Sequence, residues 1–546
     1  METTNNLNKY EYFLKNVIKG KLFLGSELKK KLVEKFNCKD SYARKIVSLA
    51  VKNKIIKKYY ENITFGKGQY MYIDFEDGDD FYFEETATEE KYKKEQNIIM
   101  EKFKENRPNI YRVLKRYYSN KEIISYFEIY KLSACTTEKT SSKITQFEEV
   151  ISILKEVTGS VVKEDQGAKY LVNQYHAEAS ESSVIKAMKE YYVELKTECI
   201  FLPIVLRWLQ NTNLVNTNVP IYRRKDKPYM GAILNNLVWD AFSYTGTVGF
   251  NEKIKILEKS QVLIELAISK EFQKEDLDGF YDRLQILRNS VKKSSKRRII
   301  PILFIKDASY SIIKEIKNLN IMCFNIKTIF GEKIIDVLEN IGRISTQILY
   351  NFNESREDIT YNVEEALNLI EETGQGENLN NLKGDFFEAL MCRVIYELYP
   401  KAIIRPNYKL SYTDENNNNI YNFEYDFIVE TKDEKIVFEL KGYSKDSVIK
   451  LGKFDKETQK PEKNTIKWFF NYTFQKAKKR MQDSERAIKA CYITTAKIEE
   501  QAIKKIQIME KTKPKELDIY YDRKKLIELL KSKGFSHEVK LIEQYY

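Results

Sequence analysis

FEYDFIV (residues 423–429) and KIVFELK (residues 435–441) are two runs in which apolar and polar side chains alternate. Alternation with a period of two is the pattern of a β-strand with one buried face. Asp426 lies on the polar face of the first run, and Glu439 and Lys441 share a face of the second. The runs therefore predict two strands that carry a cluster of charges. The apolar face of the first strand is expected to hold Phe423, Tyr425, Phe427 and Val429.

The two strands are predicted to form a hairpin whose turn is centred on Lys432 and Asp433. In that register Asp426 lies directly opposite Glu439, with Cβ atoms roughly 4.5–5.5 Å apart. Two carboxylates at that distance repel unless a proton or a cation lies between them. Lys441 is on the same face as Glu439, about 7 Å further along the strand. The arrangement predicts a divalent metal site with an ammonium group beside it.

The composition of the chain favours Mg²⁺ or Mn²⁺ at such a site. The sequence holds 2 histidines, and its 6 cysteines form no Cys-x-x-Cys pair. A metal must then be held mainly by oxygen ligands, which suits magnesium or manganese better than zinc. Ser-His-Asp triads are poorly supplied for the same reason. Neither GxxxxGK[ST] nor GxGxxG occurs in the sequence, which argues against a nucleotide-hydrolysing motor and a dinucleotide site.

A third carboxylate precedes the two strands on a helix predicted over residues 382–398. Glu388 lies at or near the edge of the apolar stripe of this helix, which is an unusual place for a carboxylate without a partner. The elements expected downstream of the strands are a helix over 466–480, strands over 487–494 and 517–521, and a helix over 522–531. Together these elements predict a mixed sheet flanked by helices.

This arrangement resembles the PD-(D/E)xK nuclease superfamily, also called restriction-endonuclease-like, over about residues 381–534. The motif is Asp426 followed by Glu439-Leu440-Lys441, with Glu388 on the preceding helix. The resemblance implies that Asp426 and Glu439 bind Mg²⁺, with Glu388 supporting or joining them. It also implies that Lys441 positions or activates the attacking water. The metal would lower the pKa of that water and stabilise charge on the phosphate.

The sequence departs from the superfamily at one position, because Tyr425 stands where the family has proline before the aspartate. The alternative interpretation is a surface hairpin with an accidental motif. Tyr443 and Gln475 are further pocket candidates, each also explained as scaffold. The segment after Lys441 mixes basic and aromatic side chains, which suits a nucleic-acid backbone. Lys476 and Lys479 are its candidate contacts, whereas its aromatic residues are better explained as helix core.

Residues 1–75 are predicted to form a winged helix-turn-helix. Helices are expected over 27–36 and 41–52, the second capped by Asp40, followed by strands over 55–64 and 69–73 with glycines at the turn between them. This order is typical of a DNA reader, although such units also dock proteins. The candidate nucleic-acid contacts are Tyr42, Arg44, Lys45 and Lys67.

The predicted organisation is a multidomain α/β chain. Residues 98–175 are expected to form a second small helical or winged-helix-like domain. Residues 198–345 are expected to form an α/β domain, and residues 381–546 the nuclease-like domain. The middle domain has a weaker echo of the motif in Asp240 and Glu265, with Ala267 where a lysine would stand. It is therefore interpreted as an inactive nuclease-like fold or, alternatively, as any α/β domain with a buried carboxylate.

The bulk properties point to a water-soluble protein with an anionic partner. The net charge is +12, which favours nucleic acid but also fits a lysine-rich solvated surface. The sequence has no apolar run long enough to span a membrane and a polar N-terminus, so a cytoplasmic protein that binds no membrane is expected.

These features lead to the hypothesis of a Mg²⁺-dependent DNA endonuclease that hydrolyses phosphodiester bonds, in prokaryotic defence or restriction. The role in defence rests on analogy with the domain combination. One alternative is a DNA-binding regulator or assembly subunit without catalysis. Another is a transposition or repair nuclease with a similar core. A homodimer and a separate partner protein both remain open, because one site per chain cuts one strand at a time.

Overall fold

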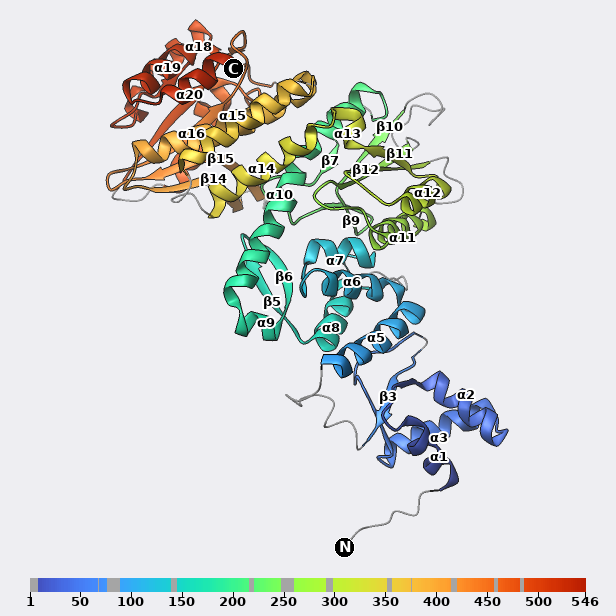
Figure 1. Cartoon of the computed structure of the whole chain (residues 1–546). Coiled ribbons are helices and arrows are strands. Elements are labelled where there is room, and N and C mark those ends of the chain that lie inside the picture. The colour runs from blue at the N-terminus through green and yellow to red at the C-terminus, as the bar shows by residue number, and fades with distance from the viewer. Residues whose placement is uncertain are drawn as a thin grey trace.

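The computed structural model describes residues 8–66, 68–75, 89–138, 145–215, 220–246, 260–290, 298–350, 356–374, 376–413, 420–455, 460–481 and 486–546. These residues form helices around several small sheets and two larger mixed sheets. In Figure 1 the N-terminal helices (blue) lie at one end, and the C-terminal sheet (orange) lies at the other, beside the middle sheet (green). The expected α/β class with several structural units is thereby confirmed at this coarse level.

The N-terminal unit combines helices with a small antiparallel sheet in the order β1-β3-β2. Its elements are α1 (Lys9–Ile18), β1 (Phe23–Leu24), α2 (Gly25–Phe36), α3 (Asp40–Lys52), β2 (Ile56–Lys58) and β3 (Met71–Asp74). The turn before β3 contains Gly66 and Gly68, both with positive φ, so glycine is used there as expected. Helix α3 buries the predicted apolar positions Ala43, Ile46, Val47 and Ala50.

Two details of this unit differ from the expectation. Asp40 is the first residue of α3 rather than its cap, and its carboxylate pairs with Lys29 at 2.5 Å. The strand expected over 55–64 ends at Lys58, because Tyr60 and Ile63 turn inward and are buried in the core shared with the next unit. Burial of these side chains replaces the pairing that a longer strand would have made.

The second unit repeats this plan from α6 onward. Its elements are α5 (Glu89–Asn106), α6 (Pro108–Ser119), β4 (Ile123–Ser125), α7 (Tyr126–Ser133), α8 (Phe147–Thr158), β5 (Ser160–Asp165) and β6 (Ala168–Asn173). Its sheet order is β4-β6-β5, so the last strand lies in the middle, as β3 does in the first unit. Strands β5 and β6 form a hairpin whose turn residues, Gln166 and Gly167, both have positive φ.

The middle sheet has the order β7-β10-β11-β12-β13; its β10 pairs are antiparallel and its β12 pairs are parallel. The elements from α9 to α13 are α9 (Gln174–Ala179), α10 (Glu181–Asn211), β7 (Ile221–Tyr222), β8 (Ala232–Leu234), β9 (Leu237–Trp239), β10 (Ala241–Thr245), β11 (Ser260–Ala267), α11 (Lys274–Ser290), β12 (Ile299–Ile305), α12 (Tyr310–Asn318), β13 (Met322–Asn325) and α13 (Ile326–Phe330). Strands β9 and β10 are separated only by Asp240.

The C-terminal sheet has the order β14-β15-β16-β18-β20, again with antiparallel pairs first and parallel pairs last. Its strands and covering elements are α14 (Ile334–Tyr350), α15 (Arg356–Glu372), α16 (Gly376–Leu398), β14 (Ile403–Thr413), β15 (Ile420–Glu430), β16 (Glu434–Lys441), the π-helix η2 (Trp468–Thr473), α17 (Phe474–Met481), β18 (Ala487–Thr494), α18 (Glu500–Gln507), β20 (Tyr520–Tyr521), α19 (Arg523–Ser532) and α20 (Ser536–Tyr545). Short elements on this side of the chain are β17 (Val448–Ile449), β19 (Lys497–Ile498) and the 3₁₀ turn η3 (Glu510–Thr512).

The helix that was expected over residues 382–398 begins earlier than predicted. Helix α16 begins at Gly376, because Leu379 and Leu382 are buried in the core and extend the helix by more than a turn. The helix expected over 466–480 is interrupted by the π-helical turn η2, which buries Phe469 and Phe470. Strand β18 matches its expected range.

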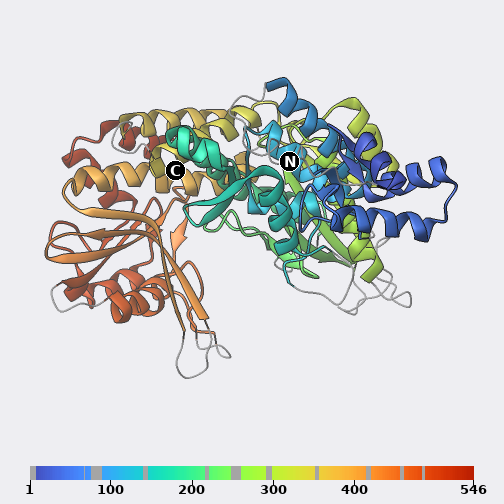
Figure 2. The same ribbon diagram turned by 90° about the horizontal axis from the view of Figure 1, so that it is seen from below.

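One hydrophobic core joins the two five-stranded sheets. It contains side chains from α10, α14, α15 and α16 together with β11 and β12 of the middle sheet and β15 and β16 of the C-terminal sheet. Figure 2 shows the yellow helices α14, α15 and α16 lying together along the molecule, with the orange C-terminal strands to one side. The helix that carries Glu388 therefore packs against both halves, and this places residues of the middle domain near the predicted site.

A candidate metal-binding active site

The strands β15 and β16 adopt the predicted hairpin register. Phe427 pairs with Phe438 and Ile428 with Val437, so one further step places Asp426 opposite Glu439. The backbone N–H of Leu440 donates a hydrogen bond of 2.6 Å to Asp426 Oδ2. The aspartate thus takes the place of a backbone acceptor in the ladder, which fixes its carboxylate at the strand edge.

The expected alternation of side chains along β15 is wrong beyond Asp426. Phe423 and Tyr425 pack in the core beneath η2 and α17, whereas Phe427 and Val429 pack in the core beneath α16. The break has a local cause: a carboxylate takes a ladder hydrogen bond at Asp426, and Asn407 on the neighbouring strand has a left-handed φ of 51°. A strand that changes faces presents its aspartate at the kink, as β-bulges do beside active sites.

Lys441 lies within the carboxylate pair. Its Nζ is 2.7 Å from Glu439 Oε1 and 3.7 Å from Asp426 Oδ2. The three side chains are between 14% and 18% exposed, so they are shielded from water but still reachable. The next residue is Gly442, where a Cβ would lie 2.5 Å from Phe387 Cβ. The absence of a side chain there lets α16 approach the end of β16 closely, which brings Glu388 to the site.

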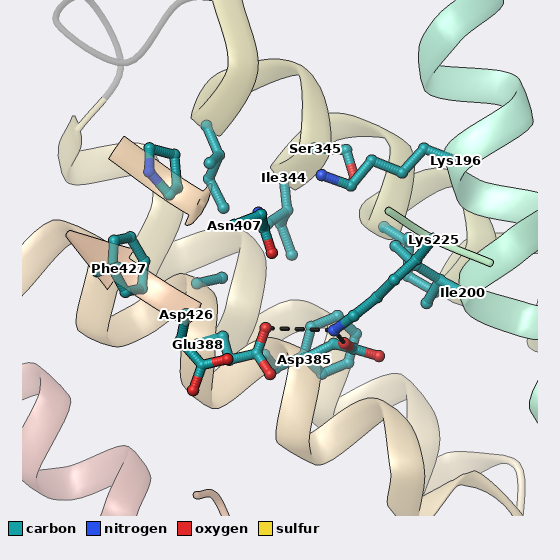
Figure 3. Close-up of a pocket in the computed structure, with 15 residues that line it drawn as sticks. Lys196, Ile200, Lys225, Ile344, Ser345, Asp385, Glu388, Asn407, Asp426 and Phe427 are labelled. Carbon is teal, nitrogen blue, oxygen red and sulfur yellow. Dashed lines mark hydrogen bonds and ion pairs between the residues drawn. The ribbon is translucent and has the colours of Figure 1, made fainter. Parts of the chain in front are cut away.

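Glu388 and Asp385 face the hairpin from α16, one helical turn apart. Together with Asp426 they line a pocket that also contains Lys225 and Lys196 of the middle domain, as Figure 3 shows. Lys225 Nζ is 2.6 Å from Asp385 Oδ1 and 3.3 Å from Glu388 Oε2. Carboxylates from α16 and β15 therefore meet lysines from α10 and from the segment after β7.

Burial is the main cause of the shifted pKa values in this site. Burial raises the pKa of Glu388 to about 8; Lys225 opposes this shift and the nearby Asp426 adds to it. Burial likewise raises the pKa of Glu439 to about 7, with Lys441 opposing and Asp426 adding to the shift. Burial and the neighbouring Lys225 ammonium lower the pKa of Lys196 to about 8. The neighbouring lysines therefore neutralise the charge of these carboxylates only in part.

The donor atoms fit a hard divalent cation, but they are not gathered around a single point. In the part of the chain that the structure describes, no three acidic, histidine or cysteine side chains are close enough together to hold a metal ion. Instead, two ammonium groups stand among the carboxylates, Lys441 at Glu439 and Lys225 at Glu388. Carboxylate oxygens are the ligands that Mg²⁺ and Mn²⁺ prefer. The metal-ligand set expected from the sequence, Asp426, Glu439 and Glu388, therefore stays a prediction.

The middle sheet contains a geometric counterpart of this site. The pairing of Ala241 with Ile264 places Asp240 opposite Glu265, and the N–H of Leu266 donates to Asp240 Oδ2 at 2.9 Å. The strand also changes faces at the aspartate, because Trp239 and Ala241 pack in different cores.

Three cations surround the two carboxylates of the middle sheet. Lys131 Nζ, from α7 of the second unit, is 2.9 Å from Asp240 and 3.0 Å from Glu265. Arg223 Nη2 is 3.1 Å from Asp240 Oδ1, and Arg283 Nη2 is 2.9 Å from Glu265 Oε1. The carboxylates are at most 2% exposed. Both carboxylates of this cluster are therefore ion-paired to side chains of the protein.

The predicted nucleic-acid contacts lie far apart in the chain. Tyr42, Arg44 and Lys45 are exposed on α3 as expected, and Arg44 lines a groove that also contains Lys29 and Lys58. Lys67 lies outside the described residues. Of the basic side chains in the segment 292–298, only Arg298 is among the described residues.

Along the C-terminal sheet, Lys479 is exposed on α17 and Lys476 is half-buried. The interpretation of the neighbouring aromatics as helix core is confirmed for Phe469, Phe470 and Phe474, which are buried. Gln475 donates to the carbonyl of Phe470 in η2, and Tyr443 packs at the edge of the same core. Neither residue lines the pocket that contains Asp426 and Glu388.

Sequence reasoning missed Asp385, Lys225 and Lys196. Asp385 could have been found, because it precedes Glu388 by one helical turn and so shares its face. The two lysines gave no local signal, since Lys225 is brought to Asp385 across 160 residues of chain.

None of the described helices has the length and apolar character needed to cross a bilayer. Comparison of the chain with protein-family models, curated proteins and solved structures found no match.

Proposed function

We propose that the C-terminal sheet is the catalytic core of a metal-dependent nuclease of the restriction-endonuclease-like type. The observation that carries the proposal is the opposition of Asp426 and Glu439 across β15 and β16, with Lys441 2.7 Å from Glu439 and Glu388 facing the pair from α16. The mixed sheet covered by helices on both faces supports the same reading.

In this proposal Asp426, Glu439 and Glu388 hold Mg²⁺ or Mn²⁺ through carboxylate oxygens. An ion held there would lower the pKa of a water molecule and stabilise negative charge on the phosphate. Lys441 would position that water or contact the scissile phosphate through its ammonium group. The Asp426 carboxylate stays in place because the Leu440 N–H holds it. The partial burial of these side chains strengthens each electrostatic contact.

The proposed substrate is DNA, and the two N-terminal units are proposed to hold it. Each has the order helix, strand, helix, helix, strand, strand with the last strand in the middle of the sheet, which is the plan of a winged helix. In the first unit α3 exposes Tyr42, Arg44 and Lys45. The net charge of +12 favours a polyanionic partner. A role in prokaryotic defence follows by analogy alone.

A non-catalytic DNA-binding subunit is the second candidate. It is favoured by the ion pairs of Lys441 and Lys225, which already neutralise carboxylates of the site. In that case the C-terminal cluster would be structural, as the middle cluster is proposed to be. A transposition or repair nuclease would share the chemistry of the first candidate, and DNA ends or partner proteins would separate it from a restriction enzyme.

Cleavage of supercoiled plasmid by the full chain, with Mg²⁺, Mn²⁺ or EDTA, tests the proposal. We expect metal-dependent nicking or cutting that Asp426→Ala, Glu439→Ala and Lys441→Ala abolish. Asp433→Ala is the matched control, because this carboxylate lies in the same hairpin but at the exposed turn. Binding of DNA, measured by fluorescence anisotropy, should persist in all variants. Equal cleavage by wild type and Asp426→Ala would refute the assignment, and DNA binding without cleavage under any metal would favour the non-catalytic subunit.

A further inference from the structure

The segment Arg223-Arg224-Lys225-Asp226 lies between the two carboxylate clusters of the molecule. Arg223 turns toward the middle cluster, where its Nη2 is 2.6 Å from Glu198 and 3.1 Å from Asp240. Lys225, two residues later, turns toward the C-terminal cluster and reaches Asp385 and Glu388. One short stretch of the middle domain thus supplies a cation to each cluster.

The same segment is fastened to the C-terminal sheet by its other side chains. Arg224 Nη2 lies 3.5 Å from Glu424 Oε2 on β15. Lys409 Nζ, on β14, lies 3.9 Å from Asp226 Oδ2 and also donates to the Asp226 carbonyl oxygen. These contacts keep the backbone of the segment beside the hairpin. The Lys225 side chain therefore extends into the site from a backbone that is held in place.

The ammonium group of Lys225 occupies the position of a cation relative to Glu388. It stands between Asp385 and Glu388 and, in Figure 3, points toward them from the side opposite Asp426. Burial alone would disfavour its charge, but Asp385, Glu388 and Asp426 raise the pKa of Lys225 well above its usual value, so it stays charged. A divalent ion bound by Glu388 would meet this positive charge within a few ångströms and be repelled by it.

We propose that Lys225, contributed by the middle domain, is a further residue of the C-terminal site and weakens its binding of divalent cations by pairing with Asp385 and Glu388. The inference rests on the proposed nuclease function. Metal binding would require Lys225 to leave Glu388. Its ammonium group would then lie beside the metal site, where it can form an ion pair with a substrate phosphate. Metal and substrate would therefore bind more tightly together than separately.

Isothermal titration calorimetry of Mn²⁺ into the full chain, without DNA, tests the proposal independently of activity. Lys225→Met removes the competing charge, and we expect its Kd for Mn²⁺ to fall by about tenfold or more. Lys225→Arg keeps the charge and should match wild type. Lys227→Met, on the same segment, removes a lysine for which no carboxylate partner is described and should also match wild type.

The outcomes separate the inference from the function on which it rests. If wild type binds Mn²⁺ at a site that Asp426→Ala removes, and Lys225→Met binds no more tightly, the role of Lys225 is refuted while the metal site stands. If no variant and no wild-type sample binds Mn²⁺, both are refuted. Circular dichroism melts of each variant check that it is folded. A variant pair, Lys225→Met and the milder Lys225→Gln, gives a second reading should either fail to fold.

Discussion

The middle and C-terminal sheets share strand order, strand directions and the hydrogen bond from a leucine N–H to an aspartate, yet their carboxylates meet different surroundings. Asp240 and Glu265 are enclosed by Lys131, Arg223 and Arg283 and are all but sealed from water. Asp426 and Glu439 share a single close lysine, Lys441 of β16, and remain partly exposed.

The difference shows how one backbone arrangement can serve two ends. Two opposed carboxylates need positive charge nearby, and the group that supplies this charge decides whether the pair is structural or functional. In the middle sheet the charge comes from protein side chains, and Lys131 fastens the second unit to the sheet. In the C-terminal sheet we propose that it comes from a metal ion. Ala267, which stands where Lys441 stands in the other sheet, accords with a middle site that is structural.

The largest effect that would separate the sheets is on cleavage. Asp426→Asn should lower the rate of plasmid cleavage by at least about a hundredfold, because it removes a proposed metal ligand. Asp240→Asn should leave the rate per folded molecule within about twofold, since its carboxylate contacts only protein groups. Each cleavage rate is divided by the concentration of folded protein before the variants are compared. A loss of cleavage in folded Asp240→Asn alone would reverse the assignment of the two sheets.

Stability should respond in the opposite sense. Lys131→Met leaves Asp240 and Glu265 buried with one cation fewer, and we expect a loss of about 3–5 kcal/mol in the free energy of unfolding. Lys441→Met should change it by less than about 1 kcal/mol, because removing an ammonium from a partly exposed site lets carboxylates take up protons or water. Urea denaturation followed by tryptophan fluorescence measures both. Similar losses in the two variants would mean that both clusters are structural.

A pH effect of intermediate size is expected at the same interface. Glu128 of α7 accepts from Arg116, Lys270 and Tyr191. Burial opposes its charge, but Lys270 and Arg116 outweigh it and lower the pKa of Glu128 to about 2. A lowered folded-state pKa stabilises the fold above the unfolded value of 4.5 and loses that contribution as the pH falls toward 2. The contribution is on the order of 3 kcal/mol.

Urea midpoints of wild type and Glu128→Gln between about pH 6 and about pH 3 check this expectation. The variant has lost the contribution at every pH, so its midpoint should fall less on acidification. Glu164→Gln, an exposed carboxylate on β5, is the matched control and should follow wild type. Parallel curves for wild type and Glu128→Gln would show that Glu128 carries no such linkage.

The smallest expected effect tests whether the middle site can be revived. Ala267→Lys restores the missing lysine of the motif, yet Lys131, Arg223 and Arg283 still surround the carboxylates. We expect the Mn²⁺ stoichiometry to stay unchanged and the melting temperature to shift by only a few degrees, on the order of 1 kcal/mol. A second Mn²⁺ equivalent in this variant would show that the lysine, and not the ring of cations, separates the two sheets.

Local pattern was enough to predict the hairpin. The turn at Lys432 and Asp433, together with alternation on both strands, set the register that places Asp426 opposite Glu439. Strand β18 was predicted for a similar reason, since it is a short apolar run. The change of face at Asp426 could not be predicted, because it depends on the Leu440 N–H and on the conformation of Asn407 in another strand.

The residues that complete the clusters were beyond the reach of periodicity. Lys131 reaches Asp240 from a different unit, across 109 positions of sequence, and its surroundings on α7 resemble those of any surface lysine. Helix α10 was not predicted as a single element, partly because Pro203 lies inside it and proline normally ends a helix. Tertiary packing of its many buried side chains overrides that local preference.

The common core beneath α10, α14 and α16 has a practical consequence for anyone who maps the protein by deletion. A fragment that starts at Gly376 would expose to solvent the apolar side of α16 that now faces α10 and α14. Such a fragment is expected to aggregate. Its lack of activity would then be mistaken for evidence that the deleted part carries the catalytic residues. Point substitutions in the intact chain, rather than truncations, can show which half of the protein performs which function.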